Sequence, residues 1–365
     1  MTQLVYIDNG YKYGFHVSKF PTLERTVQEK IKSPTTAMQL YIGNPRSFSF
    51  SDFDINDIIK AKELIQRYGI YTCIHGSLTN NPAGKDYVLK NTREGLTTEL
   101  DIGAGIGAGV VVHIGTNPDK SKGIGLIAET IVHVLAARSS YTTSFSKAFG
   151  MTRKEFRKRR LVILENAAGE GNKIGSNLKE IAEIYKRIPN NLKPQVKVCI
   201  DTAHAYGAGL YDWGIVSEVE RFYTDFDKII GLDHLGLFHL NDSRCSDSKG
   251  KNAFFGSHKD RHENLGLGYV FSDDINPLTD KQLLSQESRC DGLKKFLLMA
   301  RKHSIPIIGE PPKDGEGGRR DWGYACMLMS ETEYPIEIIT EFEPNQKKKK
   351  QVPFSEIAEK INNEL

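Results

Sequence analysis

Short apolar runs alternate with longer stretches of helical periodicity along most of this chain. Eight runs rich in β-branched and apolar residues predict strands over 13–17, 38–42, 69–74, 110–114, 161–164, 196–200, 235–240 and 305–308. Between them, apolar residues recur every three to four positions and predict helices over 22–31, 55–67, 87–102, 124–137, 177–187, 217–229 and 292–303. Strands that are apolar on both faces and alternate with helices indicate a parallel sheet covered by helices.

Eight such units predict an α/β protein with a closed (β/α)8 TIM barrel rather than an open doubly wound sheet. An open sheet would more often carry a glycine-rich phosphate loop after its first strand, whereas here the first strand is followed by VSKFPTLER. The run GAGIGAG at 103–109 precedes a strand, so we interpret it as a helix end and a turn rather than a dinucleotide fingerprint. We expect a single barrel domain over residues 1–330 and a C-terminal extension over 331–365.

Two segments depart from the strand–helix alternation. Residues 139–160 form an insert that ends in RKEFRKRR and leads into the fifth strand from its N-terminal side. We therefore expect the insert at the bottom of the barrel, as a solvated charged surface away from the chemistry. After Glu310, DGEGGRR (314–320) predicts a flexible loop at the catalytic face, and the lysine run Lys347–Lys350 predicts a solvated tail with weak attraction for nucleic acid.

Composition narrows the setting of the protein more than its function. The 365 residues are 39% hydrophobic and 26% charged, which is typical of one large globular domain, and the net charge is only +3. Any nucleic-acid surface must therefore be local. The five cysteines form no CxxC pair, and we expect Cys73 and Cys199 to be reduced core residues. Without a signal pattern or an apolar run of ~18 residues, we expect an intracellular protein, cytoplasmic or nuclear, that is neither secreted nor bound to a membrane.

The strand-like runs end repeatedly in side chains that can bind metal. These candidates are His75, His113, Glu165, Asp201, His204, His239, Asp260, His262 and Glu310. Each one alone has a structural explanation; Asp201 could cap a helix and Glu310 could sit at a helix N-terminus. Together, at the C-terminal ends of strands of one barrel, they would meet at one mouth. So many polar groups buried together would be costly without a metal to neutralise them.

The ligand types and their number indicate which metal centre to expect. Imidazole and carboxylate without thiolate favour zinc or manganese. Nine ligands exceed what one or two ions need, so three ions with one bridging carboxylate agree with the number. Three divalent ions and four carboxylates would leave a net charge of about +2, suited to a phosphodiester and its transition state. We interpret the remaining histidines (His133, His234, His258 and His303) as structural, and we expect His16 to support the site from nearby.

Four longer motifs surround these residues: LENAAGEG (164–171), IDTAHAYGAG (200–209), HLND (239–242) and DRHENLGLG (260–268). With GFHVS at 14–18 and IIGEP at 307–311, they make most of the chain resemble the endonuclease IV family of apurinic/apyrimidinic (AP) endonucleases. The resemblance does not cover the insert at 139–160 or the residues beyond Arg319.

The resemblance implies a trinuclear zinc enzyme of DNA base excision repair. By motif position, His75, His113 and Glu165 would hold the first zinc; Glu165 would bridge to a second, completed by Asp201, His239 and Glu310; and His204, Asp260 and His262 would hold the third. Manganese is an alternative at one position. Glu165 would also face the metal-activated hydroxide that hydrolyses the phosphodiester 5′ to an abasic site in double-stranded DNA and leaves a 3′-hydroxyl. We expect a monomer.

The chain departs from the family pattern beside the first ligand. The family often continues from that histidine with Asp-Ser-Tyr-Leu, but here Gly76, Ser77, Leu78 and Thr79 follow, so the aromatic wedge is missing. Arg46 aligns with the arginine that the family inserts into DNA. We therefore expect DNA contacts from Arg46 and Leu78, or from Tyr71. Two alternatives remain open: a metal-dependent sugar isomerase or epimerase of the same barrel type, which needs one or two metals, and a catalytically idle DNA-binding protein.

Overall fold

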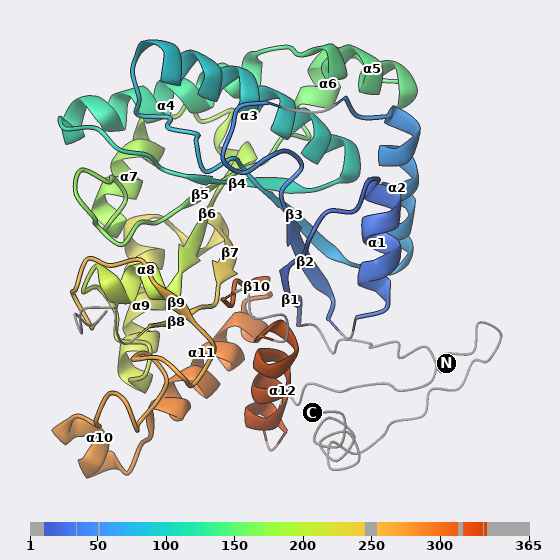
Figure 1. Ribbon diagram of the computed structural model, residues 1–365. Coiled ribbons are helices and arrows are strands. Elements are labelled where there is room, and N and C mark those ends of the chain that lie inside the picture. The colour runs from blue at the N-terminus through green and yellow to red at the C-terminus, as the bar shows by residue number, and fades with distance from the viewer. Residues whose placement is uncertain are drawn as a thin grey trace.

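Eight parallel strands close into a barrel, which confirms the predicted TIM fold (Figure 1). The structure, a computed structural model, describes residues 11–33, 35–49, 52–244, 254–312, 317–330 and 332–333. Around the barrel the strands follow the order β1-β10-β7-β6-β5-β4-β3-β2. Their bounds are β1 Tyr13–His16, β2 Ala37–Leu40, β3 Tyr71–His75, β4 Gly109–His113, β5 Val162–Glu165, β6 Val196–Asp201, β7 Leu235–His239 and β10 Ile307–Gly309.

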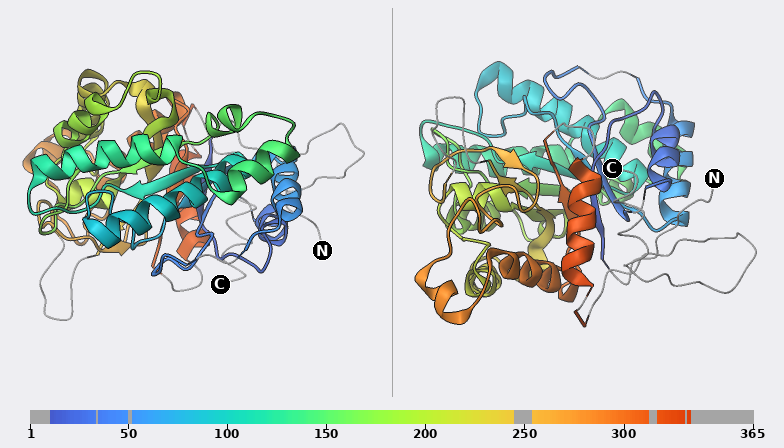
Figure 2. Two further views of the ribbon diagram at one scale, coloured as in Figure 1. Left: turned by 90° about the horizontal axis from the view of Figure 1, so that it is seen from above. Right: turned by 60° about the horizontal axis from the view of Figure 1, so that its bottom comes forward.

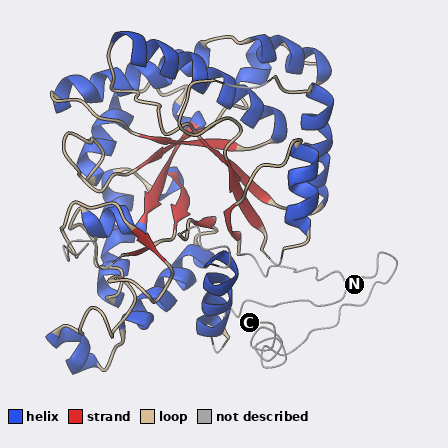
Figure 3. Ribbon diagram, in the orientation of Figure 1, coloured by secondary structure: helices blue, strands red, loops and turns tan. Residues whose placement is uncertain are grey.

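Helices form a layer outside the strands (Figure 3). Seven of them match the helices predicted from periodicity: α1 Leu23–Ile31, α2 Ile55–Arg67, α3 Asp86–Ile106, α4 Lys120–Ala136, α7 Leu178–Arg187, α9 Val216–Ile229 and α11 Arg289–Lys302. The interpretation of GAGIGAG is confirmed, because α3 ends at Ile106, Gly107 takes the left-handed C-cap conformation at φ 85°, and Gly109 begins β4. None of the described helices combines the length and apolar character that a bilayer crossing requires.

The eighth helix of the barrel was not predicted, and its first four residues were wrongly assigned to a loop. Residues 317–320 of DGEGGRR begin α12, Gly317–Met329, which lies along β1 (Figure 2, right view). Glycines are poor helix formers, so the local sequence disguised this start. A Cβ at Gly318 would lie only 3.1 Å from the Phe15 ring, so glycine permits the close approach. Trp322 then stacks on Tyr13 at 5.0 Å between ring centroids and anchors the helix. Residues 313–316 lie outside the described part of the chain.

The predicted insert forms two short helices at the N-terminal end of β5. These are α5 Ser140–Ala148 and α6 Arg153–Arg157, and they pack against α3 (Figure 1). Its placement away from the strand ends that carry the ligands is confirmed, and most of its charged residues are exposed as predicted, but Arg160 is an exception. Its side chain is fully buried, pairs with Asp101 at 2.7 Å and donates to the carbonyls of Val134 and Ala137.

The remaining elements are short. They are α8 Thr202–Gly207, α10 Asp280–Ser285, the 3-10 helices Lys193–Gln195 and Leu232–His234, and an antiparallel pair of β8 Asp242–Ser243 with β9 His262–Glu263. The β8–β9 pair follows β7, and β9 places His262 at the barrel mouth. The boundary expected at residue 330 stays a prediction, because the lysine run Lys347–Lys350 and nearly all of the extension lie outside the described residues.

A small apolar layer fills the barrel interior and is distinct from the larger core between strands and helices. It consists of Ala37, Cys73, Val111, Ile163, Cys199, Leu237 and Ile308. The two thiols are buried and free, as predicted. Because strand side chains alternate between faces, the next inward position on each strand comes two residues later, and these positions form the floor of the mouth.

Candidate metal centre

Two residues beyond the apolar layer, seven strands present polar side chains to a common centre. The positions are Gln39, His75, His113, Glu165, Asp201, His239 and Glu310, each two residues after a member of the apolar layer. Six of the seven were predicted as metal ligands. His204 on α8, His262 on β9 and Asp260 just before it complete the nine predicted residues. The structure therefore brings all nine together at the C-terminal face of the barrel.

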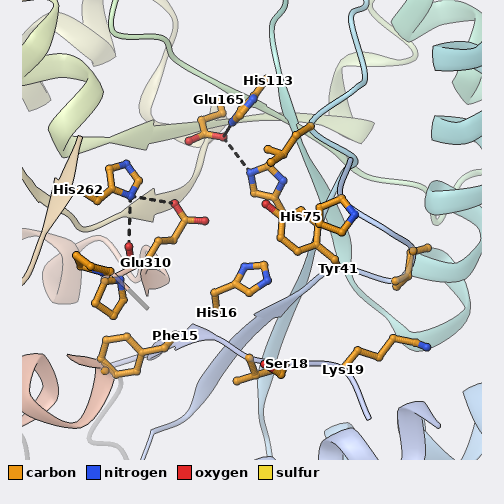
Figure 4. Close-up of a pocket in the computed structure, with 18 of the residues that line it drawn as sticks. Phe15, His16, Ser18, Lys19, Tyr41, His75, His113, Glu165, His262 and Glu310 are labelled. Carbon is orange, nitrogen blue, oxygen red and sulfur yellow. Dashed lines mark hydrogen bonds and ion pairs between the residues drawn. The ribbon is translucent and has the colours of Figure 1, made fainter. Parts of the chain in front are cut away.

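Glu165 lies at the middle of the first group. Its Oε2 is 3.5 Å from His75 Nε2 and 3.2 Å from His113 Nε2 (Figure 4). Glu165 and His75 are almost fully buried, whereas 37% of the His113 side chain is exposed. The three side chains offer ligand atoms that all lie within 4.8 Å of one another, as one metal ion would require.

The other oxygen of Glu165 belongs to a second group. Its Oε1 lies 3.0 Å from His239 Nδ1, which is also 3.4 Å from Glu310 Oε2 and 4.0 Å from Asp201 Oδ2. These four side chains again offer atoms within 4.8 Å of one another. A carboxylate whose two oxygens face different ligand groups has the arrangement that a bridging ligand needs.

The third group adjoins the second at Asp201. His204 Nε2 is 3.1 Å from Asp260 Oδ2, and His262 Nε2 is 3.4 Å from Asp260 Oδ1 and 3.5 Å from Asp201 Oδ2. Asp201, His204 and His262 form the third set of closely spaced ligand atoms. Asp201 is thus shared between the second and third groups, a contact that sequence spacing did not predict.

Hydrogen bonds at the outer ring nitrogens orient the imidazoles towards the centre. The Nδ1 atoms of His75, His204 and His262 face the backbone carbonyls of Gly76, Asn166 and Glu310 at 2.7, 3.0 and 3.3 Å. A carbonyl only accepts, so each Nδ1 carries the hydrogen and each Nε2 presents its lone pair inward. Partners of this kind are usual around metal-bound histidines.

Gln39 performs the same task for His239 and was missed by sequence reasoning. Its Nε2 donates to Glu310 Oε1 at 2.6 Å, so its Oε1 faces His239 Nε2 at 2.9 Å as the acceptor. The bond leaves His239 Nδ1 directed at Glu165. Gln39 is fully buried and also lies 3.3 Å from His16 Nδ1. Its inward position near the end of the second strand was the available signal, but glutamine is not itself a usual metal ligand.

The electrostatics of the centre favour a bound cation. Burial lowers the pKa of His204, but the carboxylates of Asp201 and Asp260 outweigh it and raise the pKa well above its usual value. Burial raises the pKa of Glu165, and His239 and His113 reverse this to hold the pKa well below its usual range. Both pKa shifts have the same cause: the buried carboxylates attract positive charge. Protons on the histidines or bound metal ions can supply that charge.

Unpartnered atoms show that the side chains fit metal ions. Among the described residues, Glu165 Oε2, His204 Nε2 and His262 Nε2 are buried without a hydrogen-bond partner. A buried polar atom without a partner costs about 1–3 kcal/mol. All three atoms point into the ligand groups, so divalent cations held there would satisfy them.

A cavity of about 1440 Å³ opens over the centre and continues towards β1 and β2. His75, His113, Glu165 and Glu310 line one part of it, and Lys19 lines the other (Figure 4). His16, whose ring lies 4.5 Å from that of Tyr41, projects between these two parts (Figure 4). Its predicted place beside the centre is confirmed.

The two residues expected to contact DNA lie on adjoining loops at the rim. Arg46 is exposed, Leu78 is 46% exposed, and Leu78 N donates to Pro45 O at 2.8 Å. Tyr71 was a wrong candidate for this role. It begins β3 and packs against the apolar interior layer, so the length of the strand separates it from the mouth.

Three of the four histidines predicted to be structural contact other parts of the protein. His234 and His303 contact Tyr185 and Tyr223, and His258 faces Ala168 O at 3.2 Å. His133 is exposed in the last turn of α4.

Known proteins resemble this chain in sequence and fold. The xylose isomerase-like TIM barrel family matches residues 33–281. The probable endonuclease 4 of Halothermothrix orenii is 30% identical over 298 residues, which cover 80% of this chain and 94% of the relative. That of Nitrosopumilus maritimus is 28% identical over 310 residues, which cover 83% and 94%.

Two solved structures share the fold. Endonuclease IV from Thermus thermophilus superimposes with a TM-score of 0.64 at 23% identity, covering 88% of this chain and 100% of that one. A D-tagatose 3-epimerase-like protein superimposes with a TM-score of 0.54 at 18% identity, covering 86% and 96%. The fold therefore occurs both in a protein named as a nuclease and in one named as epimerase-like, and it does not separate them.

Proposed function

The chain belongs to the endonuclease IV family of the xylose isomerase-like TIM barrels, and from this premise we propose that it is a metal-dependent AP endonuclease. It would hydrolyse the phosphodiester 5′ to an abasic site in double-stranded DNA and leave a 3′-hydroxyl. The observation that carries the proposal is the convergence of nine imidazole and carboxylate side chains in three adjoining groups.

The three groups would hold three divalent ions. The first ion would be bound by His75, His113 and Glu165. The second would be bound by Glu165 together with Asp201, His239 and Glu310. The third would be bound by His204, Asp260 and His262. Their nitrogen and oxygen donors suit zinc, with manganese as the alternative at one position. When bound, such ions supply Lewis acidity towards a phosphate oxygen and lower the pKa of water.

The chain's own residues would position the scissile phosphate beside these ions. The cavity over the centre is open on the side of β1 and β2, where Lys19 can approach a phosphate. Arg46 and Leu78 project from the rim, and they would contact the DNA at the lesion in place of an aromatic wedge. An abasic nucleotide is the easiest to turn out of the stack, because it has no base to unpair.

A metal-dependent sugar isomerase or epimerase is the competing function, because the barrel is shared. Such an enzyme needs the first ligand groups but not the third, formed here by His204, Asp260 and His262. Metal analysis separates the two. About three zinc equivalents per chain support the nuclease, and one or two favour the isomerase. The monomeric state and an intracellular location stay predictions.

The test of function is incision of duplex DNA that contains a tetrahydrofuran abasic analogue. We expect cleavage 5′ to the analogue, because hydrolysis at phosphorus needs no sugar aldehyde. Cleavage of natural abasic sites alone, by β-elimination, would refute the proposal. Binding of the duplex without any incision by the zinc-loaded protein would instead favour the catalytically idle DNA-binding protein.

A further inference from the structure

The insert before β5 concentrates positive charge at the end of the barrel opposite the metal centre. Residues 139–160 contain seven lysines and arginines and one glutamate, a net charge of +6, whereas the whole chain carries +3. The rest of the chain is therefore net negative, at −3. We define the basic face by six of its cations: Lys62 of α2, Lys147 of α5, and Arg153, Lys154, Lys158 and Arg159 in and just after α6. All but Lys62 are exposed, and Lys62 is half-buried.

The cations of the basic face form no close ion pairs with carboxylates in the described part of the protein. Within the described ranges of the chain, no ion pair includes any member of the basic face. The one carboxylate of the insert, Glu155, accepts hydrogen bonds from the backbone and hydroxyl of Thr152, both at 2.7 Å, and so caps α6. Its charge also interacts with Lys158, but the two form no close ion pair.

The positive charges are also crowded. Lys62 Nζ lies 4.3 Å from the centre of the Phe149 ring, and Arg159 Cζ lies 5.4 Å from the same ring. Burial lowers the pKa of Lys62, and the Arg159 guanidinium lowers it further. Like charges held together without an anion destabilise a folded protein, so an external anion would relieve this repulsion.

The face is held in place by its own small core. Phe145 stacks with Phe149 and Phe156 at 5.8 and 5.4 Å between ring centroids. Capping boxes begin both helices, and the buried Arg160–Asp101 pair fastens the end of the insert. Cations on a preorganised surface bind a ligand with little ordering cost, unlike cations on a mobile tail.

We propose that the basic face is a second nucleic-acid-binding surface, which contacts the phosphates of double-stranded DNA without regard to sequence. The cations extend over three helices rather than enclosing one small anion, which suits a polyanion of repeating charge. Double-stranded DNA carries one charge per ~1.7 Å of its axis. The insert enters β5 at one end and Glu165 ends the same strand at the other, so a short duplex at the metal centre would leave this face free.

The test compares two variants that each lose four positive charges. The first changes Arg153, Lys154, Lys158 and Arg159 to Gln. The control changes Arg67, Lys186, Lys228 and Lys302 to Gln. These exposed residues lie in the last turns of α2, α7, α9 and α11, at the same end of the barrel, but they are dispersed over four helices and none belongs to the basic face. Circular dichroism and the urea midpoint of both variants establish that they fold like the wild type.

Fluorescence anisotropy then measures binding of an undamaged 40-base-pair duplex between 50 and 200 mM salt. We expect the basic-face variant to bind at least about tenfold more weakly at low salt and to show a salt dependence reduced by about two to four phosphate contacts. We expect the control variant to stay within about threefold of wild type. Equal weakening of both variants, or of neither, would overturn the proposal, as would tighter binding of anionic lipid vesicles than of DNA to the wild-type face.

Incision of a 12-base-pair duplex with an abasic analogue tests the two sites separately. Its kcat/KM should be unchanged in the basic-face variant, because the duplex occupies only the mouth. If no incision occurs with any protein while long-duplex binding still depends on the basic face, the proposed function fails and this inference stands.

Discussion

Glu165 makes close approaches to imidazoles from four different segments. Its two oxygens lie within 3.6 Å of ring nitrogens of His75, His113, His204 and His239. The side chain is buried at the end of β5. A single residue therefore connects the first two ligand groups.

Glu165→Gln should abolish the proposed incision activity, because it removes the carboxylate that connects the first two ligand groups. The amide keeps the shape of the side chain but has only one oxygen and no charge to bridge two ions. We expect incision of the abasic analogue to fall by about 10³-fold or more, with duplex binding retained. Glu183→Gln, on the exposed surface of α7, is the control. Incision within tenfold of wild type would show that Glu165 is not at the reaction centre.

Gln39 offers a second test at the level of one residue. Gln39→Leu removes the acceptor for His239 Nε2 and the donor to Glu310 Oε1. We expect metal affinity to fall about 10–100-fold and kcat to fall more than KM rises. A chelator competition titration measures the affinity without relying on activity, and Gln66→Leu on the surface of α2 is the control. Unchanged metal release would contradict this role for Gln39.

Lys30 should give stability a pH dependence that is unrelated to the metal centre. Its ammonium group is buried and donates to Thr35 O at 2.5 Å, and burial lowers its pKa to about 7. In the unfolded chain the Lys30 side chain has a pKa of about 10.4. Between pH 7 and about 10 the unfolded chain therefore keeps a proton on Lys30 that the folded protein has lost. This group therefore makes the unfolding free energy rise as pH increases from about 7 to 10, by at most about 1.4 kcal/mol per unit.

In Lys30→Met that contribution is absent. Relative to wild type, the unfolding free energy of the variant should be highest at pH 7 or below and should decrease as pH rises towards 10. Urea unfolding of both proteins at several pH values measures the difference. A constant difference across the range would show that Lys30 stays charged in the folded protein.

At the level of elements, two segments whose local sequence misled prediction are held by distant contacts. Helix α12 begins with glycines but packs against the barrel, where Trp322 stacks on Tyr13 of β1. The insert looks like a solvated basic segment, yet its last residue is one of the largest fully buried side chains of the described protein. In both segments, burial of one large side chain decides the conformation.

Arg160 should therefore be worth more to stability than any other cation of the insert. In Arg160→Ala, Asp101 would keep its hydrogen bonds from Ser139 and Thr142 but lose the one ion-pair partner that it has within the described residues. We expect a loss of about 3–5 kcal/mol in the unfolding free energy, the usual cost of leaving a buried charge unpaired. Lys154→Ala, at an exposed position, should stay within about 0.5 kcal/mol. Urea unfolding at pH 7 checks both, and similar losses would contradict the assignment.

At the level of the whole molecule, the metal centre joins segments that span more than half of the chain. Gln39 and Glu310 are 271 positions apart and share a hydrogen bond. Neighbouring strand ends contribute one or two polar groups each, so the centre exists only when the barrel is closed. Ligand binding and barrel stability are consequently linked.

Removal of metal should lower the unfolding temperature of the whole barrel. Without cations, the buried lone pairs and carboxylates of the centre lose their partners. A metal present at 1,000 times its dissociation constant stabilises a protein by about 4 kcal/mol, which corresponds to roughly 5 °C for a chain of 365 residues. Calorimetry before and after chelation measures the shift, and added zinc should restore it. An unchanged transition in the chelated protein would show that the centre holds no metal under these conditions.

The sequence alone determined the barrel and the nine candidate ligands. Strand and helix periodicities are local properties, and the ligands stand at strand ends, where parallel topology sends every C-terminus to the same face. These features can be read without knowing any distance. The motifs around Glu165, Asp201, His239 and Asp260 indicated the family from sequence alone, because each motif is a continuous segment of the chain.

Only the tertiary structure decided which of these residues share a group and which side chains orient them. Three features depend on segments that are far apart in the sequence and that barrel closure brings together. They are the place of Asp201 in two ligand groups, the hydrogen bond of Gln39 with His239 and the buried ion pair of Arg160. A glutamine or an arginine has the same local signature whether it is buried or solvated. What distinguishes the two cases is the partner across the fold, because a buried polar group is stable only where a donor or acceptor from another segment meets it.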